Sequence, residues 1–355
     1  MKEINLSELL RRKKVVLNDI EIAQYLKGRT VLVTGAGSIG TELCRQIQRY
    51  RPERIVIFDN YENNIYDLQN ELKSCLFQGT KANFIVGSIR DARRVEQVFL
   101  EFRPTVVFHA AAHKHVPLME EHLQEAVKNN VYGTLNMVEC ADKHNCSKFI
   151  LISTDKAVNP SSIMGATKRI AEIIIQYFDK CSSTSFSAVR FGNVLESNGS
   201  VIPLFKKQIE MGGTVTVTHE DVSRYFMTIN EAGSLVIQAG AMANGGEIFI
   251  LDMGEPLNIA DLAIALIKLY GLTPGVDIKI EYIGLRPGEK LHEELFLTQE
   301  EFEITKNDRI FIEKPLALDF NNLMKEIYYF RNREMDISYI ESFIKKLVPT
   351  YKKIV

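Results

Sequence analysis

The segment that most constrains the fold is a strand, a glycine turn, a helix and a second strand. Thr30–Val33 is apolar, Gly35-Ala36-Gly37-Ser38-Ile39-Gly40 opens a helix that runs to about Tyr50, and Arg54–Phe58 leads into Asp59. The glycines let the backbone approach a pyrophosphate at the helix N-terminus, where free N–H groups favour an anion. An acid about twenty residues further on accepts from ribose hydroxyls and repels a 2′-phosphate. The segment therefore predicts a site for NAD rather than NADP.

Further apolar runs continue the alternation of strands with helical stretches, which is typical of a doubly wound sheet of parallel strands. Beyond Arg190 the pattern loosens into turns, short strands and a helix at about Ile259–Tyr270. We therefore expect an α/β fold, a doubly wound parallel Rossmann sheet with a smaller, interleaved C-terminal substrate lobe. The further strands are expected at Asn83–Val86, Thr105–Phe108, Phe149–Ile152, Phe186–Arg190 and Glu247–Leu251.

Four parts are expected along the chain. An N-terminal helical arm precedes the NAD-binding Rossmann domain, a later segment returns to that domain, and two segments build the substrate-binding lobe ahead of a helical tail. The parts are 1–27 (arm), 28–190 with 227–251 (Rossmann domain), 191–226 with 252–313 (lobe) and 314–355 (tail).

Composition argues against several other classes of protein. The net charge of −2 provides no bulk attraction to nucleic acid or to a membrane surface. No run approaches the roughly 18 apolar residues of a membrane span, and the basic run Arg11-Arg12-Lys13-Lys14 has no apolar segment behind it, unlike a signal peptide. The five cysteines form no CxxC pair, which fits a reducing compartment. A cytoplasmic protein is expected, with the basic run as a solvated helix end or, as the less favoured alternative, a contact with a partner or a membrane surface.

A second stretch, Ser153–Lys168, gathers polar side chains after a buried strand. Thr154-Asp155-Lys156 comes where that strand ends, and open α/β sheets bind ligands at the carboxyl ends of their strands. A helix is expected to begin near residues 161–162, and Met164 and Lys168 share one face of it because they are four residues apart. Taken alone, these residues are equally consistent with solvated loop charges and a surface lysine.

The residues around Lys168 resemble the extended short-chain dehydrogenase/reductase superfamily, whose catalytic helix carries Tyr-x-x-x-Lys. Here Met164, which cannot act as a general base, stands at the tyrosine position. Three further segments narrow the resemblance. They are Thr154-Asp155-Lys156, His113-Lys114-His115-Val116-Pro117-Leu118-Met119-Glu120 and Arg286-Pro287-Gly288-Glu289-Lys290-Leu291. The chain is similar to configuration-retaining UDP-N-acetylglucosamine 4,6-dehydratases of the polysaccharide-biosynthesis branch, which carry methionine there.

The resemblance covers roughly residues 7–300. Many of those relatives have a glycine loop longer by one residue, so the path of Gly35–Ser38 departs from their pattern. Many also carry an N-terminal transmembrane region that this sequence lacks. A soluble short form, or a trimmed one, is therefore expected.

The resemblance implies a redox-neutral dehydration. Hydride leaves sugar C4 for NAD, the resulting ketone acidifies the C5 proton, water is lost from C6, and the hydride returns to C6. Asp155 is expected to protonate the C6 oxygen and Lys156 to remove the C5 proton, with its pKa lowered by burial, by Lys168 and by the nicotinamide ring. Thr154 can hydrogen-bond the C4 hydroxyl, whose proton goes to water or to Asp155.

The expected binding residues follow from the motifs and from the resemblance. Small residues after the fourth strand let a flat cofactor lie against the backbone, Lys168 holds the nicotinamide ribose, and guanidinium groups suit phosphate oxygens. The expected cofactor-binding residues are Gly35, Gly37, Ser38, Ile39, Gly40, Asp59, Ser88, Ile89, Asp91, Ala110, Ala111, Ala112, Lys114, Asn129 and Lys168. The expected substrate-binding residues are His115, Glu120, Asn193, Arg224, Arg286 and Glu289.

Several alternatives stay open. A 4-epimerase or 4-ketoreductase relies on the tyrosine that Met164 replaces, and C5-inverting dehydratases usually keep it. A GDP-N-acetylglucosamine 4,6-dehydratase differs only in pocket details, whereas a non-catalytic NAD-binding regulator would not need the Asp155-Lys156 pair. His113 and His115 have a metal-like spacing, but no metal is expected. The partner is a UDP- or GDP-sugar, and a homo-oligomer is expected.

Overall fold

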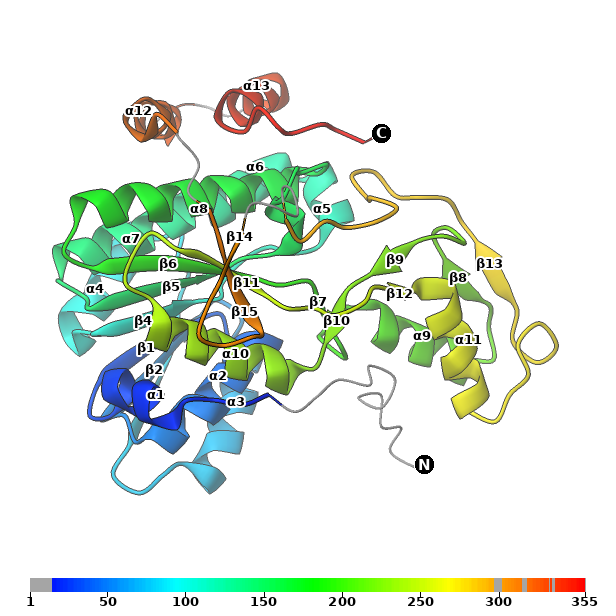
Figure 1. The fold of residues 1–355 in the computed structure, drawn as a ribbon, viewed down its shortest axis with the longest axis horizontal. Helices are drawn as coiled ribbons and strands as arrows, with labels where there is room; N and C mark the ends of the chain where they lie inside the picture. The colour runs from blue at the N-terminus through cyan, green and yellow to red at the C-terminus, as the bar shows by residue number, and fades with distance from the viewer. Residues whose placement is uncertain (1–14, 297–301, 315–317, 332, 334–335, 355) are drawn as a thin grey trace.

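The computed structural model describes residues 15–296, 302–314, 318–331, 333 and 336–354. Its centre is a nine-stranded sheet in the order β14-β15-β11-β6-β5-β4-β1-β2-β3, with helices on both faces (Figure 1). Neighbouring strands from β3 to β11 are parallel, so the predicted doubly wound α/β fold is confirmed. The strands are β1 (Thr30–Thr34), β2 (Arg54–Asp59), β3 (Lys81–Val86), β4 (Val106–His109), β5 (Lys148–Ile152), β6 (Ser185–Arg190), β11 (Ile248–Leu251), β14 (Phe302–Ile304) and β15 (Ile310–Glu313).

Each of the seven strands predicted from apolar runs overlaps one of the parallel strands, because side chains are buried on both faces of the sheet. Along β1, for example, Leu32 faces one hydrophobic core, whereas Val31 and Val33 face the other. Helices α4 (Ala92–Phe102), α7 (Thr134–Lys143) and α8 (Ile163–Cys181) contribute to the first core. Helices α1 (Asp19–Leu26), α2 (Ser38–Ile47), α3 (Glu62–Cys75) and α10 (Ile229–Met242) contribute to the second.

A smaller lobe lies beyond the carboxyl edge of the sheet, at the right of Figure 1, and has its own hydrophobic core. Short strand pairs and two helices form it. They are β7 (Asn193–Val194) with β10 (Phe226–Met227), β8 (Val215–Val217) with β13 (Ile280–Tyr282), β9 (Ser223–Arg224) with β12 (Leu257–Asn258), and helices α9 (Val201–Glu210) and α11 (Ile259–Leu269).

One part of the expected lobe belongs elsewhere. The hairpin β14–β15 extends the central sheet, since Leu251 of β11 pairs antiparallel with Ile310 of β15. A physical reason is that β11 would otherwise be an edge strand with unpaired N–H and C=O groups. Residues 302–313 were therefore wrongly assigned to the lobe, and residues 297–301 lie outside the described residues.

The tail contains helices α12 (Phe320–Arg331) and α13 (Ile337–Leu347), which pack over α8 (Figure 1). Their buried side chains, including Met324 and Phe343, join the first core. Two short helices, α5 (Val116–Glu121) and α6 (Leu123–Ala126), and a π-helical turn lead into α7. Of the expected N-terminal arm, α1 is seen, whereas residues 1–14, with the basic run, lie outside the described residues. No helix within the described part of the chain is long and apolar enough to cross a membrane.

Candidate active site

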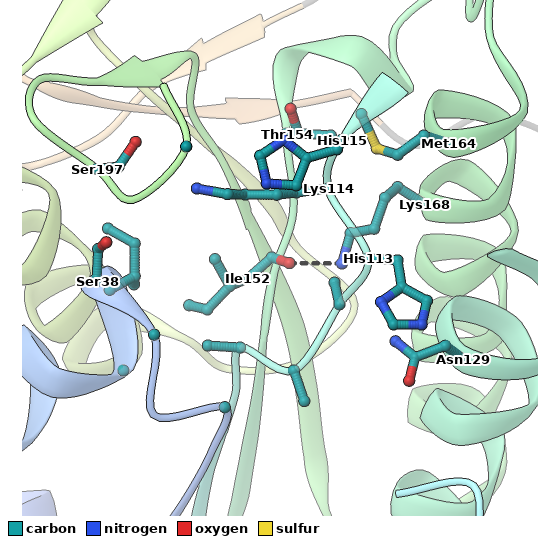
Figure 2. A pocket seen from close by; sticks show the side chains of 18 of the residues that line it. Ser38, His113, Lys114, His115, Asn129, Ile152, Thr154, Met164, Lys168 and Ser197 are labelled. Carbon is teal, nitrogen blue, oxygen red and sulfur yellow. Dashed lines mark hydrogen bonds between the residues drawn. The ribbon is translucent and has the colours of Figure 1, made fainter. Parts of the chain in front are cut away.

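A cavity of about 570 Å³ lies between the carboxyl edge of the sheet and the lobe. This is the position in which open α/β sheets bind ligands. Figure 2 shows Met164 and Lys168 projecting from α8 on one side of the cavity, and Ser38 and Ser197 on the other. The lining includes most of the expected residues: Gly35, Gly37, Ser38, Ile39, Gly40, Asp59, Ser88, Ile89, Ala110, Ala111, Ala112, Lys114, His115, Asn129, Thr154, Lys156, Met164, Lys168 and Asn193.

The glycine turn leaves room for a ligand at the start of α2. A Cβ on Gly35, which has φ of 83°, would lie 2.7 Å from Ala111 N, and a Cβ on Gly40 would lie 1.7 Å from Gly35 O. Gly37, by contrast, faces open space and caps α2 without a side-chain hydrogen bond. The first N–H groups of α2 therefore point to an anion site that suits the pyrophosphate of a dinucleotide.

Asp59 lines the cavity at the end of β2 and is fixed by two backbone donors. Its Oδ2 accepts from Ala36 N at 2.5 Å, and its Oδ1 accepts from Tyr61 N at 2.7 Å. The carboxylate is thus held beside the glycine turn, where it can also accept from ribose hydroxyls. Asp91 is placed differently, outside the lining, where its carboxylate caps α4 by accepting from Arg93 N and Arg94 N.

Helix α8 presents Met164 and Lys168 to the cavity. Ser162 caps the helix through its Oγ, which accepts from Gly165 N at 3.1 Å. The Lys168 Nζ donates to the Ile152 carbonyl at 2.7 Å, as the dashed line in Figure 2 marks. Burial lowers the pKa of Lys168 to about 8. The side chain therefore lies next to the end of β5, with an ammonium that is readily deprotonated.

Thr154, Asp155 and Lys156 form one hydrogen-bonded group beyond β5. Asp155 Oδ1 accepts from Thr154 Oγ1 and from Lys156 Nζ, both at 2.9 Å. Lys156 Nζ also donates to Asn193 Oδ1 at 3.2 Å. The other oxygen of Asp155, Oδ2, is buried and has no hydrogen-bond partner among the described residues. Thr154 and Lys156 line the cavity, whereas Asp155, which accepts from both of them, is not part of the lining.

The expectation of a lowered pKa for Lys156 is wrong in this structure. Burial alone lowers it, but the carboxylates of Asp155 and Glu293 raise the pKa of Lys156 above its usual value. Glu293 Oε1 lies 3.7 Å from Lys156 Nζ and was not among the expected residues. No sequence signal separates Glu293 from its neighbour Glu294, which is exposed and pairs with Lys290 at 3.2 Å.

Four expected substrate-binding residues lie outside the cavity lining. Arg224 is buried and donates to two carbonyl groups and, at 3.0 Å, to Glu289 Oε1. Glu120 Oε1 accepts from Ile163 N at the start of α8. Arg286 is exposed. The structure thus joins Arg224 to Glu289 and leaves Arg286 as the accessible guanidinium, while their contact with a substrate stays a prediction.

A loop of the lobe crosses the cavity and was not anticipated. Asn198 N donates to Ser38 Oγ at 3.1 Å, and a Cβ on Gly199 would lie 2.6 Å from the His115 ring. Ser197 and Ser200 line the cavity from this loop. Their sequence contains no motif, so only the tertiary fold reveals them.

A buried ion-pair network lies behind β5. Glu172 accepts from Arg190 at 2.7 Å, from Arg169 at 2.9 Å and from Ser153 Oγ at 2.6 Å. Arg190 also donates to Glu313 of β15 at 2.6 Å. Burial alone would raise the pKa of Glu172, but the two arginines hold it at about 2. The network anchors the residue that precedes Thr154.

Comparisons with known proteins identify relatives of this chain. The chain is 54% identical over 299 residues to the capsular polysaccharide biosynthesis protein CapD of Staphylococcus aureus, covering 83% of this chain and 49% of that protein. It is 32% identical over 272 residues to a UDP-N-acetylglucosamine 4,6-dehydratase (inverting) of Campylobacter jejuni, covering 75% and 77% of the two chains. A UDP-glucose 4-epimerase of Rickettsia canadensis reaches 33% over 280 residues, with coverages of 77% and 79%.

The X-ray structure of Pen from Bacillus thuringiensis matches with a TM-score of 0.75 and 34% identity, covering 86% of this chain and 99% of that one. This chain spans about half the length of CapD and of the probable polysaccharide biosynthesis protein EpsC of Bacillus subtilis, which it also matches. The model of the family described as polysaccharide biosynthesis protein matches residues 31–315. The chain therefore belongs to the polysaccharide biosynthesis protein family.

Proposed function

We propose that the protein is an NAD-dependent UDP-N-acetylglucosamine 4,6-dehydratase that retains the C5 configuration. The observation that carries the proposal is the Asp155–Lys156 pair, held at 2.9 Å, of which Lys156 lines the cavity. Elimination of water needs a base for one proton and an acid for the departing hydroxyl, and these two side chains supply both. Simple oxidation of an alcohol would not need the pair.

NAD is the cofactor that the residues suit. The N-terminus of α2 at Gly37 would hold the pyrophosphate, Asp59 the adenosine ribose and Lys168 the nicotinamide ribose. Lys168 would exchange its hydrogen bond to the Ile152 carbonyl for one to the ribose. The bound nicotinamide would take a hydride from the sugar and return it.

The residues beyond β5 have separate roles in this proposal. Thr154 orients the C4 hydroxyl, Lys156 removes the C5 proton, and Asp155 protonates the C6 oxygen as it leaves. The Thr154 hydroxyl and the Lys156 ammonium both donate to Asp155 Oδ1, so protons can be redistributed within the group without solvent. Asp155 takes the proton that it gives to the C6 oxygen from Lys156, so the C4 proton is released through Thr154 to water.

Met164 favours this reaction over its alternatives. A 4-epimerase or 4-ketoreductase needs a proton carrier on α8, and a thioether cannot serve. The same residue favours retention at C5, because inverting dehydratases of the resembled group usually keep the tyrosine. A non-catalytic NAD-binding regulator is less favoured, because Asp155 is almost fully buried beside Lys156 and nothing in a purely binding role offsets that burial.

The test is incubation of the NAD-loaded protein with UDP-N-acetylglucosamine and, separately, with GDP-N-acetylglucosamine. We expect the UDP-sugar to lose the mass of one water, and the product to keep its C5 configuration by NMR. Turnover of the GDP-sugar alone would move the assignment to the GDP-specific enzyme. Inversion at C5 would remove the link between Met164 and retention. No loss of water from either sugar, with NAD bound, would support the regulator.

A further inference from the structure

Glu293 is a buried carboxyl group that none of the roles above uses. Its side chain is 4% exposed, and its Oε1 lies 3.7 Å from Lys156 Nζ and 3.9 Å from Arg224 Nε. Both separations exceed the length of a hydrogen bond. Its Oε2 is buried and has no hydrogen-bond partner among the described residues. A carboxylate in that position would be poorly stabilised.

The cations near Glu293 have closer partners. Lys156 donates to Asp155 at 2.9 Å, and Arg224 donates to Glu289 at 3.0 Å. Lys290, on the same segment as Glu293, donates to the Val158 carbonyl at 3.1 Å and pairs with Glu294 at 3.2 Å. Each positive charge that faces Glu293 is therefore already shared with another carboxylate.

The charge balance of the cluster favours one additional proton. Asp155, Glu289 and Glu293 are three carboxyl groups beside two cations, Lys156 and Arg224, so full ionisation leaves one surplus negative charge. Buried sites disfavour such a surplus, and the proton goes to the group with the weakest contacts. That group is Glu293, whose pKa is raised by burial further than the neighbouring Lys156 lowers it.

We infer that Glu293 is a neutral carboxylic acid in the resting protein and that its neutrality lets Lys156 pass a proton to Asp155. The second half of this inference rests on the proposed function. In that transfer an N–H bond of Lys156 breaks and an O–H bond forms on Asp155 Oδ1, across the 2.9 Å hydrogen bond. The product is a free amine beside a carboxylic acid, which are the base and the acid that the elimination needs.

A neutral Glu293 explains how Lys156 can act as a base although its pKa is raised. An ionised Glu293 would add a second negative charge within 4 Å of the ammonium and hold its proton in place. A neutral Glu293 removes that attraction and leaves only Asp155, to which the proton moves. Glu293 is thus a positioning residue for a proton and does not touch the substrate.

The first experiment needs no substrate. Infrared spectra of the wild type and of Glu293→Gln are compared at neutral pH, with Glu294→Gln as the matched control. We expect a protonated carboxyl band in the wild type that is absent from Glu293→Gln and present in the control. A wild type without this difference band overturns the inference, even if the protein dehydrates UDP-N-acetylglucosamine. If the band is present but the protein dehydrates neither sugar, the proposed function is overturned, whereas the conclusion that Glu293 is neutral still holds.

The second experiment is the pH profile of kcat. The wild type should lose rate as Glu293 ionises at alkaline pH, whereas Glu293→Gln should lack this limb. The ratio of kcat at pH 9 to kcat at pH 7 is then expected to be at least about fivefold higher in the variant. A uniform loss at every pH, or an unchanged profile, overturns the inference. Should Glu293→Gln not fold, the wild-type band and the alkaline limb must titrate with the same midpoint, and different midpoints overturn it.

Discussion

Replacement of Gly37 by alanine tests how closely a dinucleotide approaches the glycine turn. A Cβ at this position would have no protein atom within 4 Å, and the backbone angles, φ −73° and ψ −167°, suit any residue. Gly37→Ala should therefore fold normally. The new methyl group would project into the cavity at the start of α2, where the pyrophosphate is expected to lie against free N–H groups.

The size of the effect follows from the hydrogen bonds that the methyl group displaces. A hydrogen bond to a charged group contributes roughly 1.5–3 kcal/mol. Loss of one such bond raises the Kd for NAD by about 10- to 150-fold. Calorimetric titration of nucleotide-free protein with NAD measures this change. The melting temperature should fall by no more than about 3 °C, since alanine at an N-cap is less favourable than glycine by about 1 kcal/mol and a change of that size shifts the melting temperature of a long chain by only about 3 °C or less.

Two control variants separate cofactor contact from damage to the fold. In Gly40→Ala the Cβ would lie 1.7 Å from the Gly35 carbonyl oxygen, so α2 must shift and the melting temperature should fall by several degrees. Gly213→Ala, in the lobe, places its Cβ 3.6 Å from the nearest atom and should change neither stability nor binding. An unchanged Kd for NAD in Gly37→Ala would refute the placement of the pyrophosphate against this turn.

Three further predictions concern chemistry and stability. Lys156→Ala should lower turnover by at least about 100-fold and abolish solvent deuterium incorporation at C5; near-normal turnover would remove lysine from the role of base. Met164→Leu should keep most activity, and Met164→Tyr should not raise it, because a buried phenol without a partner costs about 1–3 kcal/mol; a clear gain in kcat for the tyrosine variant would contradict this. Glu172 has a pKa of about 2, below its unfolded value, so it contributes about 3 kcal/mol above pH 4.5 that is lost as the pH falls towards 2. Urea unfolding from pH 5 to pH 2 should show this loss in the wild type and a smaller one in Glu172→Gln; equal losses would exclude Glu172 as the source.

The features that the sequence predicted correctly are those whose partners lie close together in the chain. The glycine turn, α2, β2 and Asp59 form one contiguous unit, and a local pattern of glycines and apolar residues determines it. Asp155 and Lys156 are adjacent, so their pairing needs only the end of β5 as a platform. The helix that carries Met164 and Lys168 begins after its N-cap Ser162, within the expected start near residues 161–162.

The features that were missed depend on segments far apart in the chain. Glu293 reaches Lys156 across 137 positions, and Arg190 reaches Glu313 across 123. No periodicity encodes such contacts, because each follows from where the lobe and the hairpin β14–β15 come to rest. The predicted direction of the pKa shift of Lys156 was wrong because the prediction counted burial and nearby positive charge but not the attraction of the adjacent Asp155, to which the distant Glu293 adds.

The segment beyond β5 explains how a chain with methionine at position 164 can keep a defined acid–base site. Ser153 Oγ donates to Glu172 in the buried ion-pair network behind β5. Arg190 of that network also donates to Glu313 of the hairpin β14–β15. Thr154 and Lys156 both donate to Asp155, and these two donors line the cavity. Proton-carrying groups are thus positioned by the strand end and not by α8. In the proposed mechanism, methionine at position 164 therefore leaves the geometry of these groups undisturbed, and Met164 needs only to fill its space.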